Sequence, residues 1–182
     1  MIDKDLLSRF CSHDENRDAL TQPWSEGEFS FASDGRMLVE VPRIAEIQEN
    51  PRAPKNVRQN IIEATTPTNL SYQPVTDILI KTVANLSPVD NCPQCGGSGN
   101  CQCRDCRASH NCGRCEGSGQ VTATFAHEGL AFKVVPLQQL IRLPKLEWSI
   151  CPDKDPLNNT KIFFRFDGGR GILSVPRIVS ED

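Results

Sequence analysis

The feature that most constrains this chain is a dense cluster of cysteines near its middle. Seven of the nine cysteines fall between Cys92 and Cys115, whereas Cys11 and Cys151 stand alone. A disulfide framework would spread its cysteines through a secreted chain, and an odd number would leave one unpaired. The segment also has almost no apolar side chains among which a thiol could be buried. We therefore expect the cluster to bind metal.

Two equivalent knuckles bracket the cluster. The pattern Cys-x-x-Cys-x-Gly-Ser-Gly begins at Cys92 and again at Cys112, and 16 residues separate Cys95 from Cys112. Two intervening residues allow both sulfurs of a pair to reach one ion at about 2.3 Å. The glycines allow a turn with positive φ that aims backbone N–H groups at the thiolates. The spacing predicts an outer zinc with four ligands: Cys92, Cys95, Cys112 and Cys115.

Four further ligand-type side chains lie between the knuckles: Cys101, Cys103, Cys106 and His110. Three thiolates and an imidazole also suit zinc, so we expect an inner ion nested within the outer one and two Zn²⁺ per chain. Three alternatives stay open. The outer four residues alone bind metal, or iron occupies a four-thiolate site, or Cys92 and Cys95 pair with Cys103 and Cys106.

The flanking segments predict a single α+β domain that is mainly antiparallel β. Its 182 residues suit one domain with a small insertion. Alternating apolar residues around Gly turns indicate strands, and apolar residues at helical spacing indicate short helices. We expect helices at 4–10, near 57–64 and from 136; strands at 29–31, 37–41, 121–125, 130–135, 162–166 and 172–175; and a helix or a strand at 78–86.

One internal repeat suggests a duplication. Residues 35–44 match residues 169–178 at a constant offset of 134, with six of ten positions identical, and Phe29 aligns with Phe163. The repeat predicts two helix-plus-hairpin units related by a pseudo-two-fold axis, although two unrelated hairpins would also share Gly turns and β-branched strands. We accordingly expect a first half-domain at 1–88, an inserted zinc module at 89–120 and a second half-domain at 121–182.

The cysteine segment resembles the cysteine-rich zinc domain of DnaJ (Hsp40) co-chaperones, which repeats Cys-x-x-Cys-x-Gly-x-Gly four times. The resemblance covers residues 92–119, and the first and last repeats match in full. The middle is degenerate, because the pair at Cys103 and Cys106 lacks its glycines. In that family the outer repeats share one zinc and the inner repeats another, so the resemblance implies the same nested ions. The chain has no His-Pro-Asp tripeptide, so the resemblance does not imply stimulation of Hsp70.

The rest of the chain resembles a domain of bacterial sliding clamps. Residues 31–36 (Phe-Ala-Ser-Asp-Gly-Arg) are similar to the ATDG-x-R turn of clamps, and residues 171–178 are similar to the closing strand of a clamp subunit. Clamp domains also duplicate a helix-plus-strands unit, so the resemblance implies a clamp-like fold. The short length, the acidic balance and the zinc insertion depart from the clamp pattern. The combined layout is also similar to phage and proteobacterial proteins of unknown function.

The charge balance argues against a general nucleic-acid binder. The chain has 20 Lys+Arg and 23 Asp+Glu, a net charge of −3, whereas nucleic-acid-binding domains are usually basic. Zinc thiolates would add negative charge to a module that is otherwise neutral, and that charge would repel phosphate. If the repeat is a duplication, it would gather Arg36, Arg43, Arg170 and Arg177 into one basic patch. The alternative, which we favour, is that each is a single solvated arginine at the end of a strand.

No catalytic constellation emerges from the three histidines. His13 and His127 fall in polar turns, and eight metal ligands fill two closed sites with no open position for a substrate. The sequence has no stretch of about 20 apolar residues, so we expect neither a transmembrane helix nor a signal peptide. We therefore expect a cytoplasmic, non-enzymatic zinc protein that binds an unidentified protein partner and no nucleic acid, membrane or small-molecule substrate. The alternative is a nucleic-acid-associated, clamp-like protein of DNA replication or phage biology.

Overall fold

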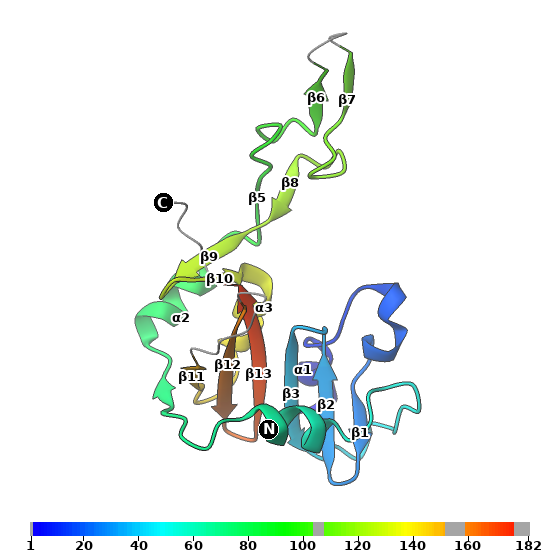
Figure 1. Ribbon diagram of the computed structural model, residues 1–182, viewed down its shortest axis with the longest axis vertical. Helices are drawn as coiled ribbons and strands as arrows, with labels where there is room; N and C mark the ends of the chain where they lie inside the picture. The colour runs from blue at the N-terminus through cyan, green and yellow to red at the C-terminus, as the bar shows by residue number, and fades with distance from the viewer. Residues whose placement is uncertain (1, 104–107, 152–158, 177–182) are drawn as a thin grey trace.

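The computed structural model describes residues 2–103, 108–151 and 159–176, and Figure 1 shows a body from which a long arm projects. The body is built on a seven-stranded sheet in the order β1-β2-β3-β13-β12-β11-β4, in which all neighbours are antiparallel. The fold is thus mixed helix and sheet and mainly antiparallel, as predicted. The strands of this sheet are β1 (Trp24–Glu26), β2 (Phe29–Ser33), β3 (Met37–Pro42), β4 (Gln73–Pro74), β11 (Glu147–Cys151), β12 (Asn159–Phe166) and β13 (Gly169–Pro176).

Two three-stranded meanders lie side by side in this sheet. Strands β1, β2 and β3 follow one another along the chain, as do β11, β12 and β13, and the two sets join through β3 and β13. The helix α1 (Lys4–Ser8) and the 3-10 helix η1 (Glu15–Leu20) precede the first meander, and α3 (Val134–Leu140) precedes the second. The Asp34 carboxylate closes the β2–β3 turn by accepting the N–H groups of Arg36 and Met37. The predicted hairpins are therefore present.

The central strand pair meets at positions that the sequence repeat relates. Leu38 of β3 lies opposite Ile172 of β13, and these two residues are 134 positions apart. An antiparallel pair in which equivalent residues face each other has a local two-fold axis through that pair. This pairing is compatible with the predicted pseudo-two-fold repeat, which stays a prediction.

The outer strands of the two hairpins do not keep the same offset. Pro42 pairs with Phe29, whereas Pro176, its counterpart in the repeat, pairs with Asn159. The register therefore matches Phe29 with Asn159 rather than with Phe163. The cause is that the turn of the second hairpin, residues 167–168, lies two positions earlier in the repeat than the turn of the first, residues 35–36, so the pairing of the outer strands shifts by four residues.

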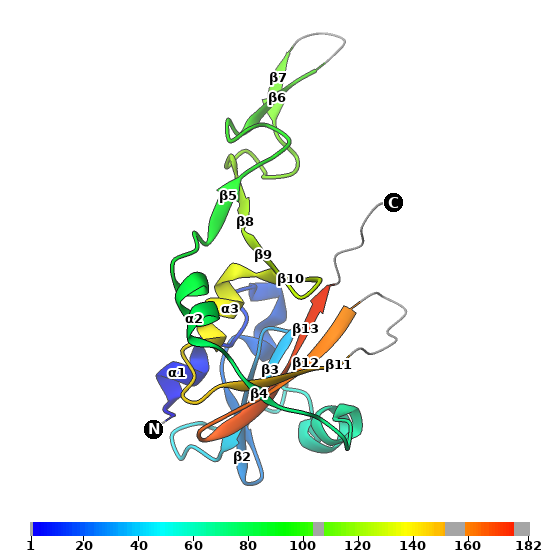
Figure 2. The same cartoon turned by 90° about the vertical axis from the view of Figure 1, so that its left-hand side faces the viewer.

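Both faces of the sheet are buried, because apolar side chains of the central strands alternate between them. In β12, Phe164 packs in a core with the helices, while its neighbour Phe163 packs in a second core on the opposite face. Figure 2 shows α1, α2 (Asp77–Ala84) and α3 on one side of the sheet and η2 (Arg58–Glu63) on the other. The largest fully buried side chains include Trp24, Phe31, Phe132, Phe164 and Leu137.

Three sequence expectations are refined by the structure. Residues 78–86, for which helix and strand stayed open, lie mostly in α2, whose first turn is capped by the Thr76 hydroxyl. The expected helix near 57–64 is present but includes a π-helical segment, so the buried residues are Val57 and Ile62, five apart, and Ile61 is left 39% exposed. The expected helix from 136 begins at Val134, so Pro136 lies in its first turn, where no intrahelical N–H is needed.

The strand expected at 121–125 divides between two ribbons. Its first part is β8 (Gln120–Thr122), which pairs with β5 (Val89–Asn91) at the base of the arm. Its second part begins β9 (Thr124–His127), which pairs with β10 (Leu130–Lys133) on the body. Periodicity alone does not reveal this change of partner, because both parts are extended.

The arm is a second, smaller structure that rises from the body between β5 and β8 (Figures 1 and 2). Beyond this ribbon it carries the two knuckles and then a distal ribbon of β6 (Asn100–Gln102) and β7 (Ser109–Asn111). Among the described residues of the arm, the one buried cluster consists of cysteines, with Val121 packed against it. Among the described residues, no helix is long and apolar enough to cross a membrane.

Candidate metal centre

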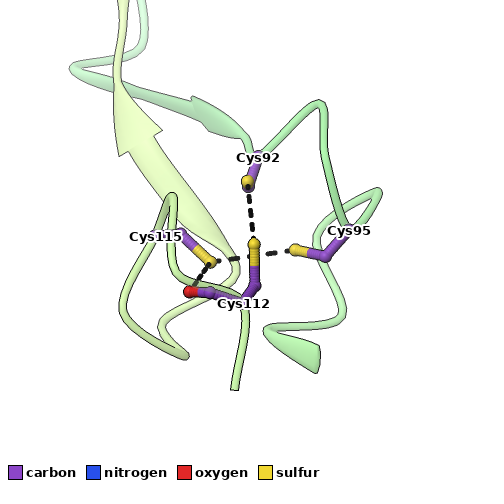
Figure 3. Close-up of side chains that lie close together, drawn as sticks. All are labelled: Cys92, Cys95, Cys112 and Cys115. Atoms are coloured by element: carbon purple, nitrogen blue, oxygen red, sulfur yellow. Dashed lines mark hydrogen bonds between the residues drawn. The ribbon is translucent and has the colours of Figure 1, made fainter. Parts of the chain in front are cut away.

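The four outer cysteines converge at the middle of the arm (Figure 3). Their sulfurs all lie within 4.8 Å of one another, although the two knuckles are offset by 20 residues in the sequence. The Sγ–Sγ distance is 3.8 Å between Cys92 and Cys112 and 3.8 Å between Cys95 and Cys115. These distances greatly exceed the ~2.05 Å of a disulfide, so all four are free thiols.

The sulfur spacing suits a tetrahedral ion. Four ligands at about 2.3 Å from a central ion lie about 3.8 Å apart, the edge of the tetrahedron. Both cross-knuckle distances have this value. The cluster therefore forms one four-cysteine group able to hold a single metal ion. Among the described residues it is the one group of cysteine, histidine or carboxylate side chains close enough to do so.

The two knuckles are related by a 20-residue offset and fasten each other. The N–H of Cys92 donates to the Gly119 carbonyl at 2.8 Å, and the N–H of Cys112 donates to the Gly99 carbonyl at 2.8 Å. Each knuckle thus closes with a hydrogen bond to the last glycine of the other. This exchange brings the two cysteine pairs to one point without an apolar core.

The last glycine of each knuckle is required by its surroundings. A Cβ on Gly99 would lie 2.3 Å from the Gly117 carbonyl oxygen, and a Cβ on Gly119 would lie 2.3 Å from the Gly97 carbonyl oxygen. Both glycines also have a φ of +76°, which disfavours other residues. The Gly-Ser-Gly segments therefore permit the close backbone approach between knuckles.

Backbone donors prepare the sulfurs to carry negative charge. The N–H groups of Gly99 and Gly119 each point at a sulfur, Cys95 and Cys115 respectively, at 3.3 Å. Desolvation opposes ionisation of Cys95, but the N–H groups of Gly99 and Gly97 and the neighbouring thiols together outweigh it and lower its pKa to about 6. A thiolate is the form that binds metal.

Two other thiols of the group are shifted in the opposite direction. Burial is the largest cause that raises the pKa of both Cys112 and Cys115, and N–H donors from the backbone offset it only in part. Several thiolates cannot share one small site without a cation to balance them. A bound divalent cation supplies that balance and would deprotonate the remaining thiols.

Polar side chains outside the cysteine motif also follow the 20-residue offset. The side chain of Asn91 lies against Gly97, and that of Asn111 lies against Gly117. The Ser98 hydroxyl bonds the Cys95 carbonyl in the same way that the Ser118 hydroxyl bonds the Cys115 carbonyl: the distances are 2.8 and 2.6 Å. Sequence reasoning missed the asparagines, although an Asn directly precedes the first cysteine of each knuckle.

The expected inner ligands lie along the distal ribbon. Cys101 is directly opposite His110 in the β6–β7 pairing, and Cys103 follows two residues after Cys101, where its N–H donates to the Ala108 carbonyl. Cys101 also packs against the outer cluster. The three inner candidates that the structure describes, Cys101, Cys103 and His110, do not lie close enough together to form a metal-binding group, and Cys106 lies outside the described residues.

The remaining candidate residues are dispersed. His127 lies at the end of β9, where its ring stacks on Phe125 with centroids 6.0 Å apart and packs near Trp148, so it is part of an aromatic cluster as well as a turn. Cys11 is buried in the main core, and Cys151 is half-buried at the sheet edge.

The proposed basic patch is only partly available. Arg170 is ion-paired with the buried Glu40, with 2.8 Å between Nε and Oε1. Arg43 donates to the Gly27 carbonyl at 2.6 Å, whereas Arg36 is exposed. Arg177 lies outside the described residues.

Comparison with known proteins adds no family to these observations: no family model, no curated protein and no solved structure matches the chain.

Proposed function

We propose that this chain is a non-enzymatic zinc protein whose metal-braced arm binds another protein. The observation that carries the metal assignment is the convergence of the four outer sulfurs within 4.8 Å of one another, with two cross-knuckle Sγ–Sγ distances of 3.8 Å that equal the edge of a zinc–thiolate tetrahedron. Soft thiolate ligands in this geometry select zinc or iron, and zinc is the ordinary occupant of structural sites of this kind. Free clustered thiols suit the reducing cytoplasm, which we propose as its compartment.

We further propose a second zinc on the distal ribbon, held by Cys101, Cys103, Cys106 and His110. Cys101 and His110 are cross-strand partners, and side chains directly opposite on a ribbon share one face. Cys103 is two residues along from Cys101 and so falls on that face too. A ribbon that presents two thiols and an imidazole on one side needs one more ligand to close a tetrahedral site.

Metal counting on freshly purified, reduced protein tests both sites. We expect two zinc ions per chain, one after Cys92→Ser, and one after His110→Ala. Unchanged zinc in His110→Ala would reject the inner site, and unchanged zinc in Cys92→Ser would reject the outer one.

The interaction role rests on the form of the arm. It projects beyond the body (Figure 2), and outside its cysteine cluster its side chains are mostly exposed and polar. A rigid projection with little core of its own serves to present a surface.

Affinity capture with matched variants tests the interaction. Arg114→Glu changes an exposed position between the second pair of cysteines, and Lys81→Glu makes the same charge change on α2. We expect a specific partner to be retained by Lys81→Glu and lost by Arg114→Glu, with zinc content unchanged in both. Equal retention by the two variants, and by a chain whose residues 92–119 are replaced with a Gly-Ser linker, would contradict the role of the arm.

The alternative is a clamp-like protein associated with nucleic acid. The paired meanders and the Leu38–Ile172 register favour a duplicated, clamp-like body. Charge disfavours nucleic-acid binding, since the net charge is −3 and Arg170 is committed to Glu40. A salt titration of binding to duplex DNA separates the two functions: a steep loss of affinity with salt supports the alternative, and no binding at low salt rejects it.

A further inference from the structure

A pocket of about 350 Å³ lies on the body, away from the metal arm. It forms where five segments meet: the residues that follow α1, the β2–β3 turn, the end of β10, the first turns of α3 and the end of β13. Its size is in the range of sites that hold small organic ligands. No residue of the four-cysteine group lines it.

The floor of the pocket is apolar. Phe10, Met37, Phe132, Leu137 and Leu173 line it, and each of them is at most 5% exposed. These side chains come from every segment that builds the pocket and are held by the main core. These side chains form the packed floor of the pocket but expose little surface themselves. Val135, which is 38% exposed, also lines the pocket and offers apolar surface to a ligand.

Cations surround this floor. Arg9, Arg36 and Lys133 line the pocket, and none of them has an ion pair with another described residue. Arg17 is the fourth cation, and it donates to the Asp34 carbonyl at 2.8 Å. Three unpaired cations around one apolar floor are notable in a chain whose net charge is −3.

The two carboxylates that line the pocket already accept hydrogen bonds from nearby residues of the same chain. Asp34 accepts the N–H groups of Arg36 and Met37 at 2.8 and 2.6 Å, which fixes the turn. Asp14 accepts the N–H of Asn16 at 3.0 Å and lies 3.7 Å from Arg17 Nε. Neither carboxylate pairs with Arg9, Arg36 or Lys133, and the lining has four cationic side chains against two carboxylates, a net charge of +2.

We propose that this pocket binds a small amphipathic organic anion, with an apolar group on the floor and a carboxylate or similar anionic group among Arg9, Arg36 and Lys133. Charge-assisted hydrogen bonds to a carboxylate are stronger than neutral ones, and an apolar group displaces water from the floor. The pocket holds the ligand without transforming it. This inference does not depend on the metal or on the arm.

Titration of the zinc-loaded, ¹⁵N-labelled full chain tests the proposal, with amide NMR signals as the readout. The probes are 4-phenylbutyrate and the uncharged analogue 4-phenylbutan-1-ol. We expect the acid to shift signals of residues around the pocket, such as Met37, Leu137 and Leu173, and to bind at least about tenfold more tightly than the alcohol. Arg36→Gln and Lys133→Gln should each weaken the acid about three- to tenfold, since each removes one charge-assisted contact.

Lys81→Gln is the matched control, because it removes one exposed positive charge on α2, away from the pocket. It should leave the affinity for the acid unchanged. Equal affinity for acid and alcohol, equal weakening by Lys81→Gln and Arg36→Gln, or shifts confined to other regions would overturn the proposal. If a glutamate-rich peptide shifted the same amide signals and bound more tightly than 4-phenylbutyrate, the proposal would be overturned in favour of a protein-docking site.

Discussion

Replacement of Gly99 by alanine tests how the arm assembles its metal centre. The new Cβ would lie 2.3 Å from the carbonyl oxygen of Gly117, so one knuckle must move away from the other. The change also places alanine at a φ of +76°, which costs about 1–2 kcal/mol. Moving the knuckle also disturbs the Gly99 N–H donor to Cys95 and the carbonyl that accepts from Cys112.

The expected loss of zinc-binding free energy follows from these contacts. Overpacking of a close contact costs about 1–3 kcal/mol, so with the backbone term Gly99→Ala should weaken zinc binding by about 2–5 kcal/mol. That loss corresponds to about 30-fold or more in affinity. The loss should appear in zinc affinity rather than in the stability of the body, because metal binding supplies the folding free energy of such a module.

Alanine substitutions at two other glycines of the arm distinguish the effect of a steric clash from the effect of backbone strain. A Cβ on Gly96 meets nothing within 4 Å but has a φ of +61°, and one on Gly113 meets nothing and has no positive φ. Glu116, at the position equivalent to Gly96, already adopts a φ of +52°. Gly96→Ala should therefore weaken zinc about fivefold, and Gly113→Ala should leave it unchanged.

Competition with a chromophoric zinc chelator measures these affinities, in a His110→Ala background that isolates the outer ion. We expect the loss of zinc affinity to increase in the order Gly113→Ala, Gly96→Ala, Gly99→Ala. If Gly99→Ala binds zinc as tightly as Gly113→Ala, the close approach of the knuckles does not hold the centre together, and the reasoning fails.

Four further predictions concern the arm and the body separately. Chelation should unfold residues 92–119 and leave the seven-stranded sheet intact, so that amide NMR loses arm signals only; collapse of the sheet signals would contradict this. Burial raises the pKa of Cys11 to about 11, so its thiol should resist iodoacetamide at pH 8 in the folded chain and react once the chain is unfolded. Because of the same shift, Cys11 should lower the free energy of unfolding as pH rises from about 9 towards 11, since only the unfolded thiol ionises in that range. Urea melts at pH 8 and pH 10 measure this loss. Phe164→Ala should lower the free energy of unfolding by about 3–5 kcal/mol, since its ring is fully buried between sheet and helices, whereas Arg52→Ala at an exposed ion pair should change it by at most about 1 kcal/mol in the same melts.

The local parts of this structure follow from the sequence. The knuckle spacing alone places Cys92 and Cys95 near one ion, because two intervening residues and the following glycines fix a tight turn. The hairpins are equally local, since a Gly-containing turn between alternating strands decides them. In both cases the controlling contacts lie within a few residues.

The features that could not be predicted from the sequence depend on contacts between distant segments or on an unusual helical pitch. The pairing of β11 with β4 and the divided strand at residues 120–127 are decided by which segment lies alongside. The side of the 57–64 helix that faces the core follows from its π-helical pitch, which sequence periodicity does not signal. The asparagines behind the knuckles were missed because the cysteine pattern by itself already explains metal binding.

Native mass spectrometry of the zinc-loaded chain tests the central claim most directly, because it counts ions on the intact protein. For the wild-type chain we predict two zinc ions, and for Cys112→Ser one, with the inner ion retained. A wild-type chain with a single ion that Cys112→Ser abolishes would keep the outer centre and reject the inner one. A Cys112→Ser chain with the same zinc content as wild type would contradict the account, since the four converging sulfurs would then not be the metal site.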